Sequence, residues 1–198
     1  MLPFSAACER NKEPILEVLR SRFAGRTQVL EIGSGTGQHA VHFARALAHL
    51  AWHPTEQLSY LADLAERVKL EGPQNLRVPT LLDVRQAVWP LRSVDAMFTA
   101  NTLHIMAWPL VVALFRGSCP VLAPGGVLCV YGPFRYAGRH TSQSNQEFDR
   151  MLQERDPASG IRDLEAVTVL AAQYGLRLDA DHDLPANNRL VVFTKEPG

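Results

Sequence analysis

The segment that decides the fold reads VLEIGSGTG and covers residues 29–37. Its apolar first half is typical of a short buried strand over residues 28–32. Glycines follow at positions 33, 35 and 37, and an apolar pattern of helical spacing begins directly after them. Glycine allows a tight turn and lets a ligand approach bare backbone. The segment therefore predicts a strand, a ligand-binding turn and a helix.

The glycine spacing separates two classes of ligand. A dinucleotide fingerprint has its third glycine three positions after the second, but that position is Gln38 and the glycine is Gly37. A carboxylate at Glu31 would also repel a pyrophosphate. The pattern therefore argues against a nicotinamide oxidoreductase. The residues expected to form the cofactor loop are Gly33, Ser34, Gly35 and Gly37.

Strands and helices alternate on both sides of this segment. Helices are expected over residues 13–23, 58–68, 110–122 and 164–174, and further strands near residues 49–53, 76–82, 94–100, 127–131, 176–178 and 190–194. Pro54 is expected to end the second strand. We predict one α/β domain over residues 1–198, with an N-terminal helical segment over residues 1–25 and a Rossmann-like, doubly wound sheet of seven strands.

A polar stretch from about residue 133 to residue 162 interrupts the alternation. It is too long for an ordinary connection between two elements. We interpret it as an insertion near the active site, with a short helix over residues 147–152.

Composition excludes several function classes. The 198 residues are 46% hydrophobic and 20% charged, and 20 basic residues balance 20 acidic ones. This balance lacks the basic footprint of nucleic-acid binding, so no nucleic-acid partner is expected. No stretch approaches the ~20 apolar residues that cross a bilayer, and no membrane partner is expected. We expect a cytoplasmic protein with a small-molecule substrate, and both a monomer and a homodimer remain open.

The Gly-x-Gly-x-Gly spacing, preceded by Glu31, resembles motif I of class I S-adenosylmethionine-dependent methyltransferases. The resemblance implies S-adenosylmethionine as cofactor and a sheet whose last strand is antiparallel. It also implies that Glu31 faces the cofactor's amino group, directly or through water, that Glu56 holds the ribose hydroxyls, and that Asp83 meets the adenine amino group. Two alternatives remain open: Glu56 as an exposed loop residue and Asp83 as a turn or helix-cap residue.

Several shorter segments resemble one narrower group, the methyltransferase-like 26 family, also described as a domain of unknown function (DUF938). They are ERNKEPIL at residues 9–16, WHPTE at 52–56, ANTLHI at 100–105, TSQSN at 141–145, RDP at 155–157, GIRD at 160–163 and PANN at 185–188. The resemblance spans essentially the whole chain. It implies further cofactor contacts at Asn101, Asn11 and Lys12, and it names no methyl acceptor.

Methyl transfer requires an acceptor atom in line behind the methyl carbon and often a base. His104, after the fourth strand, is the candidate base, and a histidine that is merely buried remains the alternative. The candidate walls and anchors of a substrate pocket are Tyr131, Phe134, Arg135, Tyr136, Arg139, Asn145, Arg155, Arg162 and Asn187. For the arginines, ion pairs within the polar stretch are an open alternative.

His39 and His42 lie three residues apart on one helix, but no third ligand has matching spacing, so no metal site is predicted. Our leading hypothesis is methyl transfer from S-adenosylmethionine to a small polar acceptor. The alternative is a non-catalytic module that binds S-adenosylmethionine or S-adenosylhomocysteine, because a fold of this class does not specify its chemistry.

Overall fold

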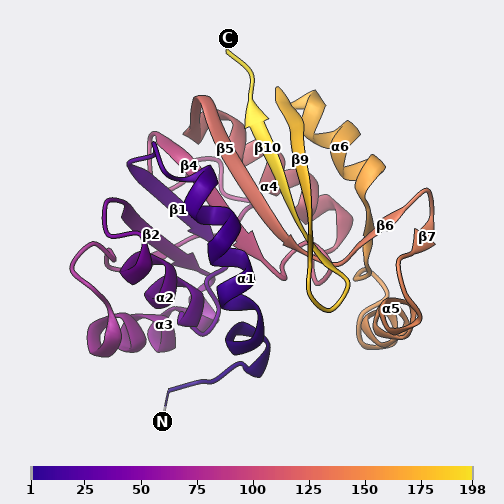
Figure 1. Ribbon diagram of the computed structural model, residues 1–198, viewed down its shortest axis with the longest axis horizontal. Coiled ribbons are helices and arrows are strands. Elements are labelled where there is room, and N and C mark those ends of the chain that lie inside the picture. The colour runs from indigo at the N-terminus through magenta and orange to yellow at the C-terminus, as the bar shows by residue number, and fades with distance from the viewer. Residues whose placement is uncertain (1, 198) are drawn as a thin grey trace.

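The computed structural model describes residues 2–197, and residues 1 and 198 of the predicted domain lie outside this range (Figure 1). A seven-stranded sheet has the order β3-β2-β1-β4-β5-β10-β9. Its strands are β1 (Gln28–Ile32), β2 (Ala51–Glu56), β3 (Thr80–Leu81), β4 (Val94–Ala100), β5 (Leu122–Gly132), β9 (Leu176–Leu184) and β10 (Asn188–Lys195). The strands from β1 to β5 pair in parallel, and β10 is antiparallel to both its neighbours. The predicted fold class is confirmed.

Helices cover both faces of the sheet (Figure 1). The helices are α1 (Ala6–Arg22), α2 (Gln38–Ala46), α3 (Leu58–Glu71), α4 (Trp108–Val121), α5 (Gln143–Arg155) and α6 (Leu164–Gln173). The core is divided accordingly: α1 and α2 contribute to one buried cluster, and α4 and α6 to the other. Val29 and Leu30 of β1 point into opposite clusters, as the alternation of a strand requires. Both layers therefore hold β1, and with it the glycine loop, in place.

The boundaries expected for the second and third strands were wrong. Pro54 lies inside β2, which continues to Glu56. The backbone of Trp52 and Glu56 bonds toward the β3 side, so Pro54 also faces that side, where pairing lapses between Leu76 and Thr80. Its missing N–H therefore breaks no ladder bond. The same lapse reduces the third strand, expected over residues 76–82, to β3 alone.

The polar stretch is ordered. It forms a small sheet of order β7-β6-β8, made of β6 (Phe134–Tyr136), β7 (Arg139–His140) and β8 (Arg162–Asp163), together with α5. Helix α5 is longer than the expected 147–152 because the Ser142 side chain caps it, accepting from the Asn145 N–H at 3.1 Å. Figure 1 shows α5 at the same end of the molecule as the turn between β9 and β10.

Helix α1 starts earlier than expected. Ser5 caps it by accepting from the Cys8 N–H at 3.3 Å, so the helix runs from Ala6 and includes Pro14. The expected helical segment over residues 1–25 thus contains this one helix. Its buried side chains Ile15, Leu16 and Leu19 pack in the same cluster as α2.

Candidate functional site

The glycine loop joins β1 to α2, and its glycines have left-handed backbones with φ of 71° at Gly33, 55° at Gly35 and 77° at Gly37. A Cβ at Gly33 would come within 3.0 Å of Thr102, and one at Gly37 within 2.8 Å of Leu64. At Gly35 a Cβ would meet nothing within 4 Å. A side chain at either outer position would therefore crowd Thr102 or Leu64, whereas Gly35 faces open space.

Glu56 is the last residue of β2 and lies against this loop. Its carboxylate accepts from the Gly35 N–H at 2.6 Å and from the Gln57 N–H at 2.7 Å. The side chain is buried, yet it forms part of a cavity wall. The alternative of an exposed loop glutamate is thereby wrong.

The first cavity, of about 560 Å³, opens above the glycine loop. Gly33, Gly35 and Asn101 form its polar backbone wall, and Ile105, Met106 and Leu110 form an apolar wall. Among residues 2–197, the charged residues that line it are Glu56 and Asp63, and no lysine or arginine lines it. An acidic cavity with one apolar wall suits a cationic ligand with a flat apolar part and repels a pyrophosphate.

The second cavity, of about 690 Å³, adjoins the first. Both are lined by Asn101 and Ile105. The second also has Arg10, Asn11, His104, Tyr131 and Phe148 in its wall, together with the turn between β9 and β10. Asn101 is held with φ of 58°, and its N–H donates to the Tyr131 carbonyl at 2.9 Å. The residue predicted after the fourth strand thus stands where the two cavities meet.

Glu31 lies below the loop and lines neither cavity. It is 2% exposed, and the Trp52 indole N–H donates to its carboxylate at 2.9 Å. Burial raises the pKa of Glu31 to about 7, against the lowering effect of hydrogen bonds from Trp52 and Ser34. Ser34 is buried too, and it ties the loop to β2 through bonds with Thr55.

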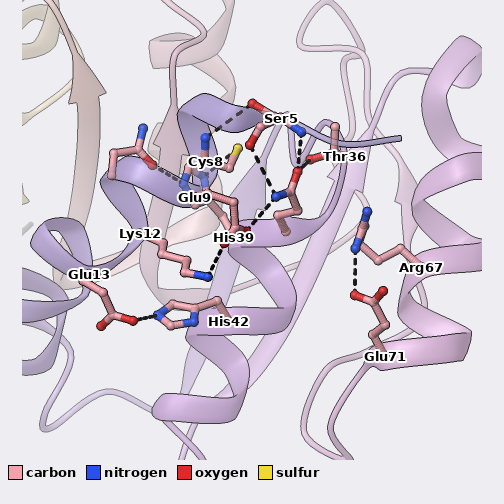
Figure 2. Close-up of polar contacts among 12 residues, drawn as sticks. Ser5, Cys8, Glu9, Lys12, Glu13, Thr36, His39, His42, Arg67 and Glu71 are labelled. Carbon is pink, nitrogen blue, oxygen red and sulfur yellow. Dashed lines mark hydrogen bonds and ion pairs between the residues drawn. The ribbon is translucent and has the colours of Figure 1, made fainter. Parts of the chain in front are cut away.

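The two cofactor contacts predicted on α1, Asn11 and Lys12, lie in different surroundings. Asn11 lines the second cavity, and its carbonyl oxygen lies 2.7 Å from His39 Nε2. Lys12 lines neither cavity and forms an ion pair with Glu9 at 2.5 Å (Figure 2). Of the two cofactor contacts predicted on α1, only Asn11 therefore lines either cavity.

Asp83 lies in a separate groove next to the first cavity, with Gln57 lining both. The Arg85 guanidinium Nε donates to its carboxylate at 2.9 Å, as does the Arg85 N–H. These bonds lower the pKa of Asp83 to about 2. The structure shows Asp83 as a turn residue, one of the two alternatives for this position.

His104 is 5% exposed, and its ring packs edge-on against Phe148 with centroids 5.4 Å apart. Burial, assisted by the positive charge of Arg162, lowers the pKa of His104 to about 4. The ring is therefore neutral at pH 7, which leaves it free to accept a proton but makes it a weak base.

Among the residues predicted to contact substrate, only Tyr131 lines a cavity described above. Phe134 belongs to the core. The Asn145 amide donates to Thr141 Oγ1 at 2.9 Å and to the Asn187 carbonyl at 3.0 Å, so it fastens α5 to the β9–β10 turn.

The predicted arginine anchors lie outside the two cavities. Arg162 donates to the carbonyls of Leu103, Met106 and Ala158 and so holds the loop after β4. Arg155 is exposed at the end of α5. Arg135 pairs with Asp163 at 2.8 Å, which is the alternative noted for it. The Tyr136 hydroxyl donates to Asp181 at 2.6 Å, and Arg139 lines a solvent-open groove along α5.

Sequence reasoning missed the segment that crosses the first cavity. Pro3 lines that cavity, and its carbonyl accepts from Arg67 at 2.6 Å. The Ser5 N–H donates to the buried Gln38 side chain at 2.6 Å (Figure 2). No motif marks these contacts. Arg10 and Phe148 were missed too, although Arg10 lies one position before Asn11 on α1 and so had a neighbouring signal.

Two kinds of feature are missing from residues 2–197. No helix there is long and apolar enough to cross a membrane. No group of three or more metal-ligating side chains occurs there either. His39 bonds to Asn11, and His42 pairs with Glu13 at 3.3 Å.

Comparison with known proteins agrees with this geometry. Residues 2–195 match the family described as "Protein of unknown function (DUF938)". The chain belongs to the DUF938 family. This confirms the narrower resemblance drawn from the short segments.

Several solved structures of similar fold are methyltransferases. The S-adenosylmethionine-dependent methyltransferase SibL in its apo form gives a TM-score of 0.81 at 19% identity over 97% of this chain and 56% of SibL. Mitomycin 7-O-methyltransferase MmcR gives a TM-score of 0.80 at 18% identity, over 96% of this chain and 55% of MmcR. Human N-acetylserotonin methyltransferase in complex with S-adenosylmethionine gives a TM-score of 0.81 at 14% identity, over 96% of this chain and 53% of the human enzyme. This chain spans little more than half the length of each, and at these identities the likeness establishes the fold.

Proposed function

We propose that the chain binds S-adenosylmethionine in the first cavity and transfers its methyl group to a small polar acceptor in the second. The single observation that carries the proposal is the junction of the two cavities at Asn101 and Ile105. Transfer needs a donor and an acceptor that meet in line, and two adjoining cavities with a shared wall supply that arrangement.

The first cavity fits the cofactor in shape and charge. Gly35 leaves open space beside bare backbone, and the Glu56 carboxylate at the end of β2 is suited to accept from ribose hydroxyls. The apolar wall suits an adenine ring. The described residues that line this cavity include two acidic side chains and no basic one, which favours a cationic ligand. When bound, S-adenosylmethionine supplies a methyl carbon made electrophilic by its positively charged sulfur.

The residues of this chain then act by positioning. Asn101 and Ile105 separate the two ligands, so only an acceptor seated against them reaches the methyl carbon. The acceptor's lone pair forms the new bond as the carbon–sulfur bond breaks, and the electron pair of that bond goes to sulfur. A proton on the acceptor goes to neutral His104 or to solvent. Because the pKa of His104 is near 4, positioning contributes more than basicity.

Binding is tested with Glu56→Gln, which keeps the size of the side chain but removes its charge and one of the two oxygens that accept from the Gly35 and Gln57 N–H groups. We expect S-adenosylhomocysteine to bind this variant about 10- to 100-fold more weakly, since hydrogen bonds to a charged group contribute about 1.5–3 kcal/mol. The matched control is Glu66→Gln, because Glu66 is exposed on the same helix as Asp63 and lines neither cavity. Equal affinity of the two variants would contradict the assignment of Glu56.

Transfer is tested by incubating the protein with methyl-labelled S-adenosylmethionine and an extract of small polar metabolites. We expect label in a small-molecule product with the unmodified chain and none with Gly35→Asp, whose added carboxylate would face Glu56. Cofactor binding without transfer to any fraction would instead support a non-catalytic binding module.

A further inference from the structure

A chain of hydrogen bonds runs from α2 to the second cavity and starts at His39. This residue is 5% exposed, and burial lowers its pKa to about 4, so the ring is neutral. Its Nε2 lies 2.7 Å from the carbonyl oxygen of Asn11, an atom that only accepts. The single ring hydrogen therefore sits on Nε2.

The other ring nitrogen agrees with this assignment. His39 Nδ1 lies 4.0 Å from the Cys8 sulfur, and Figure 2 shows both side chains between α1 and α2. Burial raises the pKa of Cys8, so the thiol keeps its hydrogen and can donate to Nδ1. Hydrogen donation therefore runs in one direction, from Cys8 to His39 and from His39 to Asn11.

The next residue along this series of hydrogen bonds is Tyr131. Because the Asn11 oxygen is occupied by His39, the NH₂ group of Asn11 is left as its hydrogen-bond donor, and Asn11 and Tyr131 both line the second cavity. Hydrogen bonding by Asn11 lowers the pKa of the Tyr131 hydroxyl, against the larger rise caused by burial, as expected of a donor to the phenol oxygen. The Tyr131 oxygen is then the acceptor, and its own hydrogen remains free to donate to a ligand.

The charge of the residues that line the second cavity points to an anionic ligand. Arg10 lines the second cavity, and none of the described residues that line it carries a carboxylate. An O–H donor and a guanidinium in one cavity are complementary to an anionic oxygen. The described lining of the first cavity has the opposite character, with acidic side chains and no basic one.

We propose that the second cavity takes an acceptor carrying an anionic oxygen, such as a small carboxylic acid, held by Tyr131 and Arg10, with Asn11 and His39 as positioning residues that aim the Tyr131 hydroxyl. This inference rests on the proposed function, since it concerns the acceptor of the same transfer.

The test is calorimetry on the full chain saturated with S-adenosylhomocysteine. The probes are matched pairs: benzoate with benzamide, and phenylacetate with phenylacetamide. We expect a carboxylate to bind about tenfold or more tightly than its amide, as charge-assisted hydrogen bonds exceed neutral ones. Equal binding within both pairs would overturn the inference. Failure of S-adenosylhomocysteine itself to bind would instead overturn the proposed function.

Asn11→Asp tests the direction of the chain. One carboxylate oxygen still accepts from His39, while the other accepts the Tyr131 hydrogen and turns that donor away from the ligand. We expect the preference for the carboxylate to fall about tenfold, as in Tyr131→Phe. Asn188→Asp is the control, because it adds the same charge to the same wall without a hydrogen bond to His39. An equal loss in both aspartate variants would overturn the positioning role.

His39 is tested by rescue. His39→Gln retains an N–H for the Asn11 oxygen, so it should keep the preference for the carboxylate, whereas His39→Leu should lose it. Loss in both variants with normal binding of S-adenosylhomocysteine would contradict the assignment of His39 as the group that orients Asn11.

Discussion

Gly35 and Gly125 form a matched pair that separates backbone strain from ligand contact. Both have left-handed backbones, with φ of 55° and 73°, and a Cβ at either would meet nothing within 4 Å. Alanine at either position therefore carries the same strain of about 1–2 kcal/mol. In a domain of this size we expect both variants to melt about 2–8 °C lower than the unmodified protein.

Only Gly35 lines the first cavity, and Gly125 lies at the start of β5, at the opposite end of the sheet. A methyl group at position 35 enters the space that the cofactor needs. Forced displacement of this kind costs about 1–3 kcal/mol, which weakens binding about 5- to 150-fold. Gly125→Ala should bind normally.

Thermal unfolding and calorimetric titration with S-adenosylhomocysteine measure the two effects on the same samples. If Gly35→Ala is destabilised as expected and still binds as tightly as Gly125→Ala, the ligand does not approach the loop at Gly35. The first cavity would then not be the cofactor site.

Three further predictions concern buried polar groups. The pKa of Glu31 is raised to about 7, so the folded protein loses stability as this carboxyl ionises between about pH 4.5 and pH 7. Glu31→Gln cannot ionise, so its free energy of unfolding should rise relative to that of the unmodified chain, by up to about 3 kcal/mol between pH 5 and pH 8, as measured by urea unfolding. The His104 ring should stay neutral, with constant NMR shifts, from pH 6 to pH 8. Asn145→Ala should cost about 1–3 kcal/mol in unfolding free energy through two lost hydrogen bonds, with unchanged affinity for S-adenosylhomocysteine.

Each of these three outcomes has a clear contrary result. A stability difference at Glu31 that does not vary with pH would mean that the carboxyl is not desolvated. A His104 signal that titrates near pH 6.5 would place the ring in contact with solvent. Weakened cofactor binding in Asn145→Ala would mean that Asn145 contributes to the cofactor site.

The loop and the fold were predictable because both depend on local, short-range patterns. Apolar period, glycine spacing and the acid at Glu56 are all readable along the chain, and strand order follows from the class they indicate. Pro54 was misread because its effect depends on which side of β2 its nitrogen faces, and this depends on pairing with a strand more than twenty residues away.

The acceptor side was less predictable for a related reason. Asn145 and Arg162 are polar residues in a polar stretch, and nothing in the sequence says whether such groups face a ligand or the backbone of a distant loop. In the structure both satisfy backbone carbonyls. Asn11 and Tyr131 lie far apart in the sequence yet line one cavity, because α1 packs on the face of the sheet to which Tyr131 also contributes.

The most direct test of the account is calorimetric titration of the purified chain with S-adenosylmethionine, S-adenosylhomocysteine and NAD. The acidic lining of the first cavity predicts micromolar binding of the first two and no binding of NAD, whose pyrophosphate it would repel. Binding of NAD alone, or of none of the three, would contradict the assignment of this cavity to the methyl donor.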